Sequence, residues 1–183
     1  MRAKPLCSAR LTLLPLDTSD AQELWEVVDA SRGSLEPWLP WVSYHQDVGS
    51  AIHFADASVA DWEQGRAARF AIRCQPDGRL SGVVGLESCV AMHRSCEIGY
   101  WLRHDATGKG LMTEAARMCM QFAFKRVGVH RLRVAAATTN HPSLRVIARL
   151  GFQFEGVARH AEWCYGRWLD HATFSVLEHE WIG

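Results

Sequence analysis

The stretch Tyr100–Ala115, Y-W-L-R-H-D-A-T-G-K-G-L-M-T-E-A, decides the fold of this chain. A short apolar run ends at Leu102, a loop of small residues follows with Gly108 and Gly110, and a helical pattern begins directly after the loop. This order of strand, glycine loop and helix start directs backbone N–H groups and the positive end of a helix dipole at one place. The stretch therefore predicts a binding site for a phosphate or pyrophosphate group.

Neither of the two common nucleotide motifs fits this loop. A P-loop needs a serine or threonine after its lysine to hold magnesium, but Leu111 follows Gly108-Lys109-Gly110 here. The dinucleotide pattern G-x-G-x-x-G fails as well, because Thr113 stands at its third glycine. A phosphate site with neither a metal ligand nor a ribose-binding acid suits a group carrier such as coenzyme A better than phosphoryl or hydride transfer.

The periodicity outside this stretch predicts an α/β (α+β) fold in a single domain spanning residues 1–183. The sequence Pro76-Asp77-Gly78 is a strong hairpin signal between two of the expected strands. We expect strands over residues 10–16, 69–74, 80–90, 95–102, 131–138, 152–158 and 173–181, and helices over 20–31, 48–65, 111–127 and 140–150. Antiparallel strands followed by strand-helix-strand-helix-strand indicate a mixed sheet.

Composition excludes several classes of function. The chain has 183 residues, of which 48% are hydrophobic and 22% charged, and its 20 basic residues balance 20 acidic ones. A neutral chain has no long-range attraction to nucleic acid or to a membrane surface. No apolar stretch approaches the roughly 18 residues that span a bilayer, and the N-terminus lacks the apolar core of a signal peptide. We therefore expect a cytoplasmic protein.

The six cysteines contain no C-x-x-C pair, so we expect buried, unpaired cysteines. Cys89, His93 and Cys96 lack a usual zinc spacing and a fourth ligand, which predicts no metal site. Trp38 and Trp41 lie among prolines in L-E-P-W-L-P-W-V. This segment is expected either to form the wall of a pocket or to pack on a partner subunit.

Several motifs in a fixed order resemble the GNAT acetyltransferases, and within them the RimJ/RimL branch of protein N-terminal acetyltransferases. The pyrophosphate loop of that family is usually [Q/R]-x-x-G-x-[G/A], which aligns with Asp105–Gly110 except that Asp105 replaces Gln or Arg. The other motifs are L-E-P-W-L-P-W-V, E-I-G-Y-W-L before the loop, N-x-x-S at Asn140–Ser143, R-L-G-F at Arg149–Phe152 and G-x-W-x-D at Gly166–Asp170.

The resemblance implies a mostly antiparallel twisted sheet with a central, splayed parallel pair of strands and helices on both faces. It also implies acetyl-CoA as the cofactor, with direct acetyl transfer to an amine. Carried over residue by residue, the expected cofactor-binding residues are Trp101, Leu102, Arg103, Gly108, Lys109, Gly110, Leu111, Met112, Asn140 and Ser143. Members of this branch can form dimers, so a homodimer is one expected assembly.

The chemistry of the reaction favours a particular amine. Attack on a thioester needs a neutral amine, N–H donors for the oxyanion and a proton for the leaving thiolate. A terminal α-amine has a pKa of about 7.7–8.0, against about 10.4 for lysine, and therefore needs only a modest base. The main interpretation is the N-terminal α-amine of a protein, of the ribosomal serine or alanine type. The alternatives are a small amine (an antibiotic, a polyamine or an aminoacyl compound) and a non-catalytic acyl-CoA-binding module.

Three residues are the catalytic candidates. RimL-like members carry a candidate base glutamate and a serine 19 residues before it, a spacing that Glu162 and Ser143 reproduce. Ser143 is then a proton donor to the thiolate, whereas the competing interpretation makes it only a helix cap. Glu97 lies where many GNAT enzymes carry a carboxylate, but a strand glutamate more often pairs with an arginine. The competing interpretation of Glu162 is a solvated acidic residue in a loop, with no role in catalysis.

Three further side chains that can take part in proton transfer or nucleophilic chemistry lie close to Glu162 in sequence. His160 and His171 could relay a proton. A nucleophilic Cys164 is disfavoured, because no histidine stands at a spacing that activates it.

Overall fold

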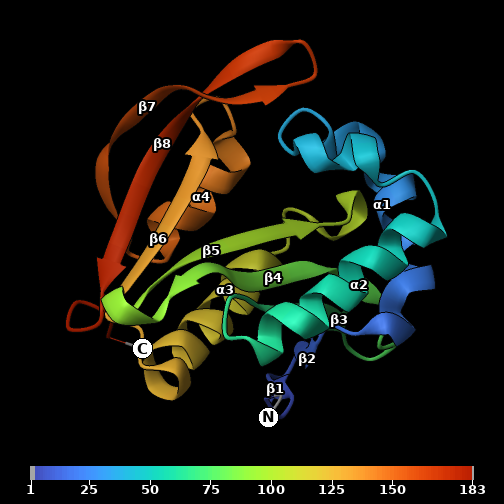
Figure 1. Ribbon diagram of the computed structural model, residues 1–183, viewed down its shortest axis with the longest axis horizontal. Coiled ribbons are helices and arrows are strands. Elements are labelled where there is room, and N and C mark those ends of the chain that lie inside the picture. The colour runs from blue at the N-terminus through green and yellow to red at the C-terminus, as the bar shows by residue number, and fades with distance from the viewer. Residues whose placement is uncertain (1–2, 183) are drawn as a thin grey trace.

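The computed structural model describes residues 3–182 and is organised around one eight-stranded sheet in the order β1-β2-β3-β4-β5-β6-β8-β7 (Figure 1). Neighbouring strands are antiparallel except β5 and β6, which run parallel. The strands are β1 (Leu6–Cys7), β2 (Leu11–Pro15), β3 (Ala68–Cys74), β4 (Leu80–Val90), β5 (Ser95–Leu102), β6 (Arg131–Ala137), β7 (Gln153–Cys164) and β8 (Arg167–Leu177). The main helices are α1 (Ala21–Leu35), α2 (Val48–Glu63), α3 (Leu111–Phe122) and α4 (His141–Arg149). Shorter helical segments are η1 (Thr18–Asp20), η2 (Pro40–Tyr44), η3 (Ala91–His93), η4 (His104–Ala106) and a π-helical turn, η5 (Ala123–Val127). The mixed fold with one parallel pair and helices on both faces is confirmed.

Two hydrophobic cores lie on opposite faces of the sheet. Helices α1 and α2 cover one face, with Leu24 and Val28 in its core, and α3 and α4 cover the other, with Met120 and Ile147. Side chains of a strand alternate between the two faces. On β5 the even-numbered residues Cys96 to Leu102 therefore pack with α3 and α4, whereas Trp101 packs with α1 and α2.

The parallel strands β5 and β6 stay paired over only three residues. Their register runs from Ser95 opposite Arg131 to Glu97 opposite Arg133 and then stops. Beyond that point β5 continues along β4 and β6 continues along β8, so the two strands diverge, as Figure 1 shows. The inner edges of β5 after Glu97 and of β6 after Arg133 have no strand partner within residues 3–182. The predicted splay is present.

The helices begin where their capping residues lie. The Asp47 side chain accepts the Ser50 N–H at 2.7 Å at the start of α2, and Asn140 accepts the Ser143 N–H at 3.2 Å at the start of α4. Such caps satisfy N–H groups that have no partner inside the helix. None of the helices in the described part of the chain is both long and apolar enough to span a membrane.

The C-terminal strands differ most from the expectation. Instead of strands over 152–158 and 173–181 with a loop between them, β7 and β8 form one long hairpin that turns at Tyr165 and Gly166. Two register shifts, the second between Ala158 and Glu162, interrupt the alternation of inward and outward side chains along the hairpin. A search for residues that alternate with a period of two therefore does not find the full strands. Helix α1 also runs past the expected end at residue 31 to Leu35, and the short strand β1 was not predicted.

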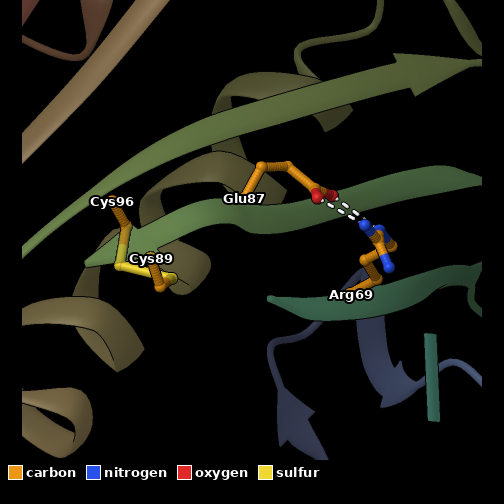
Figure 2. Close-up of a disulfide and its surroundings, with 4 residues drawn as sticks. All are labelled: Arg69, Glu87, Cys89 and Cys96. Atoms are coloured by element: carbon orange, nitrogen blue, oxygen red, sulfur yellow. Dashed lines mark hydrogen bonds and ion pairs between the residues drawn. A yellow bond between two sulfur atoms is a disulfide. The ribbon is translucent and has the colours of Figure 1, made fainter. Parts of the chain in front are cut away.

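Cys89 and Cys96 form a disulfide, which corrects the expectation of unpaired cysteines (Figure 2). The register of β4 and β5 shifts between Glu87 and Val90, and the two Cα atoms lie 4.2 Å apart across this irregularity. A spacing of seven residues carries no signal of such a turn. The other four cysteines are free; Cys119 and Cys164 are buried as expected, whereas Cys74 is only half-buried and Cys7 is exposed.

Candidate active site

The glycine loop presents unpaired backbone donors at the start of α3. Gly108 and Gly110 have φ angles of 76° and 77°, a left-handed conformation that favours glycine. The first backbone donor inside α3 is Glu114, which reaches the Gly110 carbonyl at 3.2 Å. The N–H groups from Gly108 to Thr113 have no acceptor in residues 3–182. A row of free N–H groups at a helix N-terminus fits the diphosphate of coenzyme A.

Arg10, a residue that the sequence analysis did not identify, fixes this loop. Its guanidinium donates to the Lys109 carbonyl at 3.2 Å and forms an ion pair with Glu114. Burial favours the protonated form of Glu114, but hydrogen bonds from Ser8 and Arg10 outweigh it and lower the pKa of that carboxyl. The 104 residues between Arg10 and Glu114 explain why no local pattern predicted this contact.

The residue that departs from the family loop pattern is paired locally. Asp105 accepts two hydrogen bonds from Arg103, one of them at 2.6 Å. These bonds hold the pKa of Asp105 below its usual value. The negative charge of Asp105 is therefore compensated by the guanidinium of Arg103, which weakens its repulsion of an anion bound in the loop.

Two of the predicted cofactor residues on β5 have buried or half-buried side chains. Trp101 packs against Trp41, with ring centroids 6.0 Å apart, and Leu102 packs on the α3/α4 core. Their backbone, however, forms the unpaired inner edge of the splay. Any contact of these two residues with a carrier threaded between the strands is therefore made by main-chain atoms.

Tyr100 and Ser143 form a pair of hydroxyls beside the splay. The Tyr100 Oη atom lies 3.1 Å from Ser143 Oγ on α4. Burial raises the pKa of Tyr100 to about 12, partly offset by this hydrogen bond. Ser143 is not the cap of α4, since Asn140 takes that role. The interpretation of Ser143 as a helix cap is therefore wrong, and its hydroxyl is directed at Tyr100.

The opposite face of the sheet carries carboxylates. Glu97 pairs with Arg133 at 3.2 Å, so the pairing with an arginine that competed with its role as a base is observed. Glu87, directly across the strands from Glu97, pairs with Arg69. Burial raises the pKa of Glu87, although Arg69 opposes this shift.

Glu162 has a different partner. Its carboxylate lies 3.4 Å from His171 Nε2, and the two residues come from opposite strands of the β7–β8 hairpin. His171 is the more buried of the two, with 20% of its side chain exposed against 36% for Glu162. His160 instead stacks on Trp168. Of the two histidines considered as relays, the structure brings His171 to Glu162.

A cavity of about 620 Å³ lies between the first two helices and the sheet. Glu87 and Arg69 lie on its sheet side, and it reaches β5 at Gly99–Trp101. Its other lining residues are Leu24, Val28, Leu39, Trp41, Tyr44, His45, Ser50, His53, Phe54 and Val83. The cavity therefore extends to the strand that borders the splay, and sequence reasoning had named only two of its lining residues, Trp41 and Trp101.

The Trp/Pro segment packs inside its own chain. Arg167 of the hairpin lies over the Trp38 ring at 5.9 Å and donates to the Pro37 carbonyl at 3.2 Å. Trp41 lines the cavity. Of the two expected roles, the structure shows the pocket wall.

Comparisons with known proteins agree with this geometry. The Acetyltransferase (GNAT) domain family matches residues 10–153. YdaF of Bacillus subtilis, named as a ribosomal N-acetyltransferase, is 31% identical over 175 residues, covering 94% of both chains. The [ribosomal protein uS5]-alanine N-acetyltransferase of Escherichia coli is 26% identical over 96% of this chain and 92% of its own.

A solved structure, Mycobacterium smegmatis RimJ in complex with CoA-disulfide, superposes with a TM-score of 0.88. It is 29% identical, over 94% of this chain and 84% of the other. The chain therefore has the fold of a protein solved with coenzyme A as a disulfide. The protein belongs to the GNAT family and is an N-acetyltransferase with acetyl-CoA as its acetyl donor.

Proposed function

We propose that the enzyme transfers acetyl directly to the N-terminal α-amine of a protein, of the ribosomal serine or alanine type for which its relatives are named. One observation carries the proposal: the two kinds of proton-transfer group lie on opposite faces of the sheet, on either side of the splay. Tyr100 and Ser143 lie on the α3/α4 face, and the glutamates of β4, β5 and β7 on the other.

Residues of the glycine loop and of the segments that border the splay would bind the carrier. The free N–H groups from Gly108 through Met112 hold the diphosphate, with Lys109 as an exposed cation beside it. The main chain of Trp101, Leu102 and Arg103 and the residue Asn140 border the path between the strands. Bound acetyl-CoA supplies an activated acyl group in the form of a thioester.

Ser143 supplies the proton for the leaving thiolate. Its hydroxyl is held by Tyr100, whose pKa, raised to about 12 by burial, keeps the phenol protonated at any physiological pH. A hydroxyl that accepts from a protonated phenol can donate its own proton onward. Ser143 is the proposed catalytic group, and Tyr100 its positioning partner.

Glu162 is the proposed base for the amine. The carboxylates of Glu87 and Glu97 already form ion pairs with Arg69 and Arg133, so a substrate amine would have to compete with a guanidinium for either of them. The partner of Glu162 is a histidine, the side chain type that exchanges protons near neutral pH. Glu97 is the second candidate, at the paired end of the splay.

The cavity lining does not favour a polyamine. Its only acidic residue is Glu87, which is already hydrogen-bonded to Arg69 by two bonds of 2.7 and 2.6 Å. A polycation needs several unpaired carboxylates, so an acceptor with a single amine fits the charges better.

The test is acetylation of hexapeptides that begin with serine or alanine, measured by thiol release and mass spectrometry, beside an N-terminally blocked lysine peptide and spermidine. We expect α-amine products only. Glu162→Gln should lower kcat/KM at pH 7 by about 100-fold or more, the range for loss of a general base.

Glu178→Gln is the matched control, because Glu178 also pairs with a histidine and lies away from the splay. The control should keep full activity. Turnover of Glu162→Gln equal to that of the unmodified enzyme from pH 6 to 9 would remove Glu162 from the mechanism. Acetylation of spermidine alone would refute the proposed acceptor.

A further inference from the structure

The cavity beneath η2 is lined by a buried histidine, His45, and one of its ring nitrogens has no hydrogen-bond partner among the described residues. His45 is 6% exposed, and its Nε2 atom is buried with no hydrogen-bond partner in residues 3–182. Buried polar atoms in folded proteins nearly always have a partner. Because His45 lines the cavity, a molecule that enters the cavity can provide that partner.

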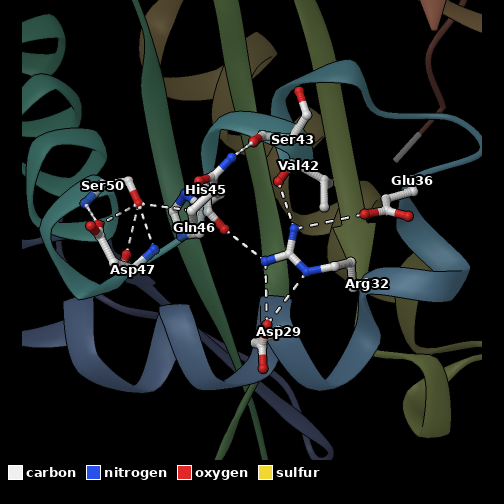
Figure 3. Close-up of polar contacts among 9 residues, drawn as sticks. All are labelled: Asp29, Arg32, Glu36, Val42, Ser43, His45, Gln46, Asp47 and Ser50. Carbon is white, nitrogen blue, oxygen red and sulfur yellow. Dashed lines mark hydrogen bonds and ion pairs between the residues drawn. The ribbon is translucent and has the colours of Figure 1, made fainter. Parts of the chain in front are cut away.

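A network from α1 holds the segment that carries this ring (Figure 3). Arg32 donates to the Val42 carbonyl and to the His45 carbonyl, both at 2.8 Å. Arg32 is itself held by Asp29 at 3.3 Å and Glu36 at 3.8 Å. The His45 ring also packs edge-on against Trp41, with centroids 5.8 Å apart. The imidazole is therefore fixed in place before any ligand arrives.

His45 is neutral at physiological pH. Burial lowers its pKa, and the positive charge of Arg32 lowers it further, against a smaller opposing effect of Asp47. A neutral imidazole has one donor nitrogen and one acceptor nitrogen. A hydroxyl group can pair with Nε2 in either tautomer, because it both donates and accepts.

The rest of the lining is aromatic and balanced in charge. Trp41, Phe54 and Trp101 contribute aromatic rings, and the two charged lining residues, Arg69 and Glu87, are paired with each other, with Arg69 also bonded to Asp61 of α2. A serine or alanine side chain is far too small to fill about 620 Å³. The volume lies within the range of pockets that bind small organic groups, and the mostly apolar lining suits an uncharged group.

We propose that this cavity is a specificity pocket for a hydroxylated aromatic side chain, a tyrosine close to the acceptor's N-terminus, whose hydroxyl pairs with His45 Nε2. The inference rests on the proposed function, because it assigns the second or third residue of the acceptor whose α-amine is acetylated. Gly99, Tyr100 and Trp101 line the cavity and also border the splay where the amine would lie, so a neighbouring residue of the same peptide would lie close to the cavity.

The first experiment compares hexapeptides that start with alanine and carry tyrosine, phenylalanine, leucine or lysine at position 2, and separately at position 3. At one of these positions we expect kcat/KM for tyrosine to exceed that for phenylalanine by at least 10-fold, and that for lysine by more. The difference should appear in KM, since the pocket holds a group remote from the reacting carbonyl. Tyrosine and phenylalanine peptides that differ by less than 3-fold at both positions would overturn the inference.

Two variants separate the hydrogen bond from packing. His45→Phe keeps an aromatic ring beside Trp41 and should reduce the tyrosine-to-phenylalanine ratio to about 1. His53→Phe, an exposed histidine that also lines the cavity, is the matched control and should leave the ratio unchanged. A ratio that persists in His45→Phe would also overturn the inference. His45→Gln serves if the phenylalanine variant does not fold.

A binding measurement distinguishes failure of the inference from failure of the proposed function. p-Cresol and toluene are titrated into the unmodified enzyme, and the ¹⁵N resonance of His45 Nε2 is followed. Tighter binding of p-cresol with a shift of that resonance, even when no peptide is acetylated, supports the pocket and refutes only the peptide acceptor. Equal binding of the two probes with no shift, in an enzyme that does acetylate peptides, refutes only the pocket.

Discussion

The buried phenol of Tyr100 makes stability depend on pH in a defined direction. An unfolded tyrosine ionises near pH 10, whereas burial raises the pKa of Tyr100 to about 12 in the folded state. Above pH 10 the unfolded state loses this proton first, so stability falls as pH rises toward 12. Urea unfolding from pH 9 to 11.5 should show the unmodified protein losing about 2 kcal/mol relative to Tyr100→Phe.

Tyr44→Phe is the control for this measurement, because Tyr44 is 80% exposed. Its stability relative to the unmodified protein should stay constant over the same pH range. If Tyr100→Phe behaved in the same way, the buried phenol would not be coupled to folding as the structure indicates.

At the scale of single residues, local patterns in the sequence predict only part of the candidate site. The glycines of the loop were predicted because their conformation has a sequence signature. Asn140 and Ser143 were correctly placed at a helix start, but only the structure shows which of them caps it. Tyr100 was missed as a functional residue, because its partner lies 43 residues away and nothing in E-I-G-Y-W-L indicates that contact.

At the scale of elements, the loop and α3 depend on a clamp from the N-terminal segment. Arg10→Ala removes the hydrogen bond to the Lys109 carbonyl and leaves Glu114, in the first turn of α3, with Ser8 as its donor but without a paired positive charge. We expect the Kd for coenzyme A, measured by calorimetry, to rise about 3- to 10-fold, corresponding to one lost charge-assisted contact. Stability should change by less than about 1 kcal/mol, since the Arg10 side chain is 53% exposed.

Arg94→Ala provides the matched comparison. Arg94 is similarly exposed, donates to the Gly128 carbonyl at 2.8 Å and pairs with Glu178, but it lies outside the glycine loop. Its loss should leave the affinity for coenzyme A unaltered. Equal effects of the two substitutions would mean that Arg10 does not organise the loop.

The order of most elements was predictable, whereas the hairpin was not. Apolar periodicity and turn residues mark β3, β4 and the helices, because these elements satisfy local rules. The hairpin breaks those rules: its register shifts twice, and nearly every residue of β7 is exposed. Its position instead depends on tertiary contacts with Pro37 and Trp38.

At the scale of the whole molecule, one guanidinium ties α2 to the sheet. Arg69 on β3 bonds to Glu87 on β4 and, at 2.8 Å, to Asp61 on α2, and only 14% of its side chain is exposed. Arg69→Met leaves Glu87 without its arginine and Asp61 with only the exposed Arg66, which should cost about 3 kcal/mol in urea unfolding. Adding Glu87→Gln to this variant should recover at least about 1 kcal/mol, because a neutral amide needs no counter-ion.

Arg66→Met tests whether burial is the cause. Arg66 pairs with the same Asp61 at 2.7 Å but is 55% exposed, so its loss should cost less than about 1 kcal/mol. Comparable losses from both arginines would show that α2 is not anchored through the buried pair.

The cavity belongs to this largest scale, which is why sequence patterns did not reveal it. Its lining comes from α1, η2, α2 and three strands, and Leu24 is more than 70 residues from Trp101. No local sequence pattern indicates that these separate elements enclose a cavity. His45 is one of nine histidines, and nothing in its neighbouring residues distinguishes it from the others.

Because β5 and β6 diverge after Glu97 and Arg133, the sheet separates two faces of the molecule and is interrupted between these two strands. The proposed proton donor lies on one side of the sheet and the proposed proton acceptor on the other, so we expect the two substrates to enter and leave from opposite faces. A spent carrier can then be exchanged while the modified polypeptide is still docked. Kinetically, this arrangement gives a ternary complex with no compulsory order of release, and parallel double-reciprocal plots would contradict it.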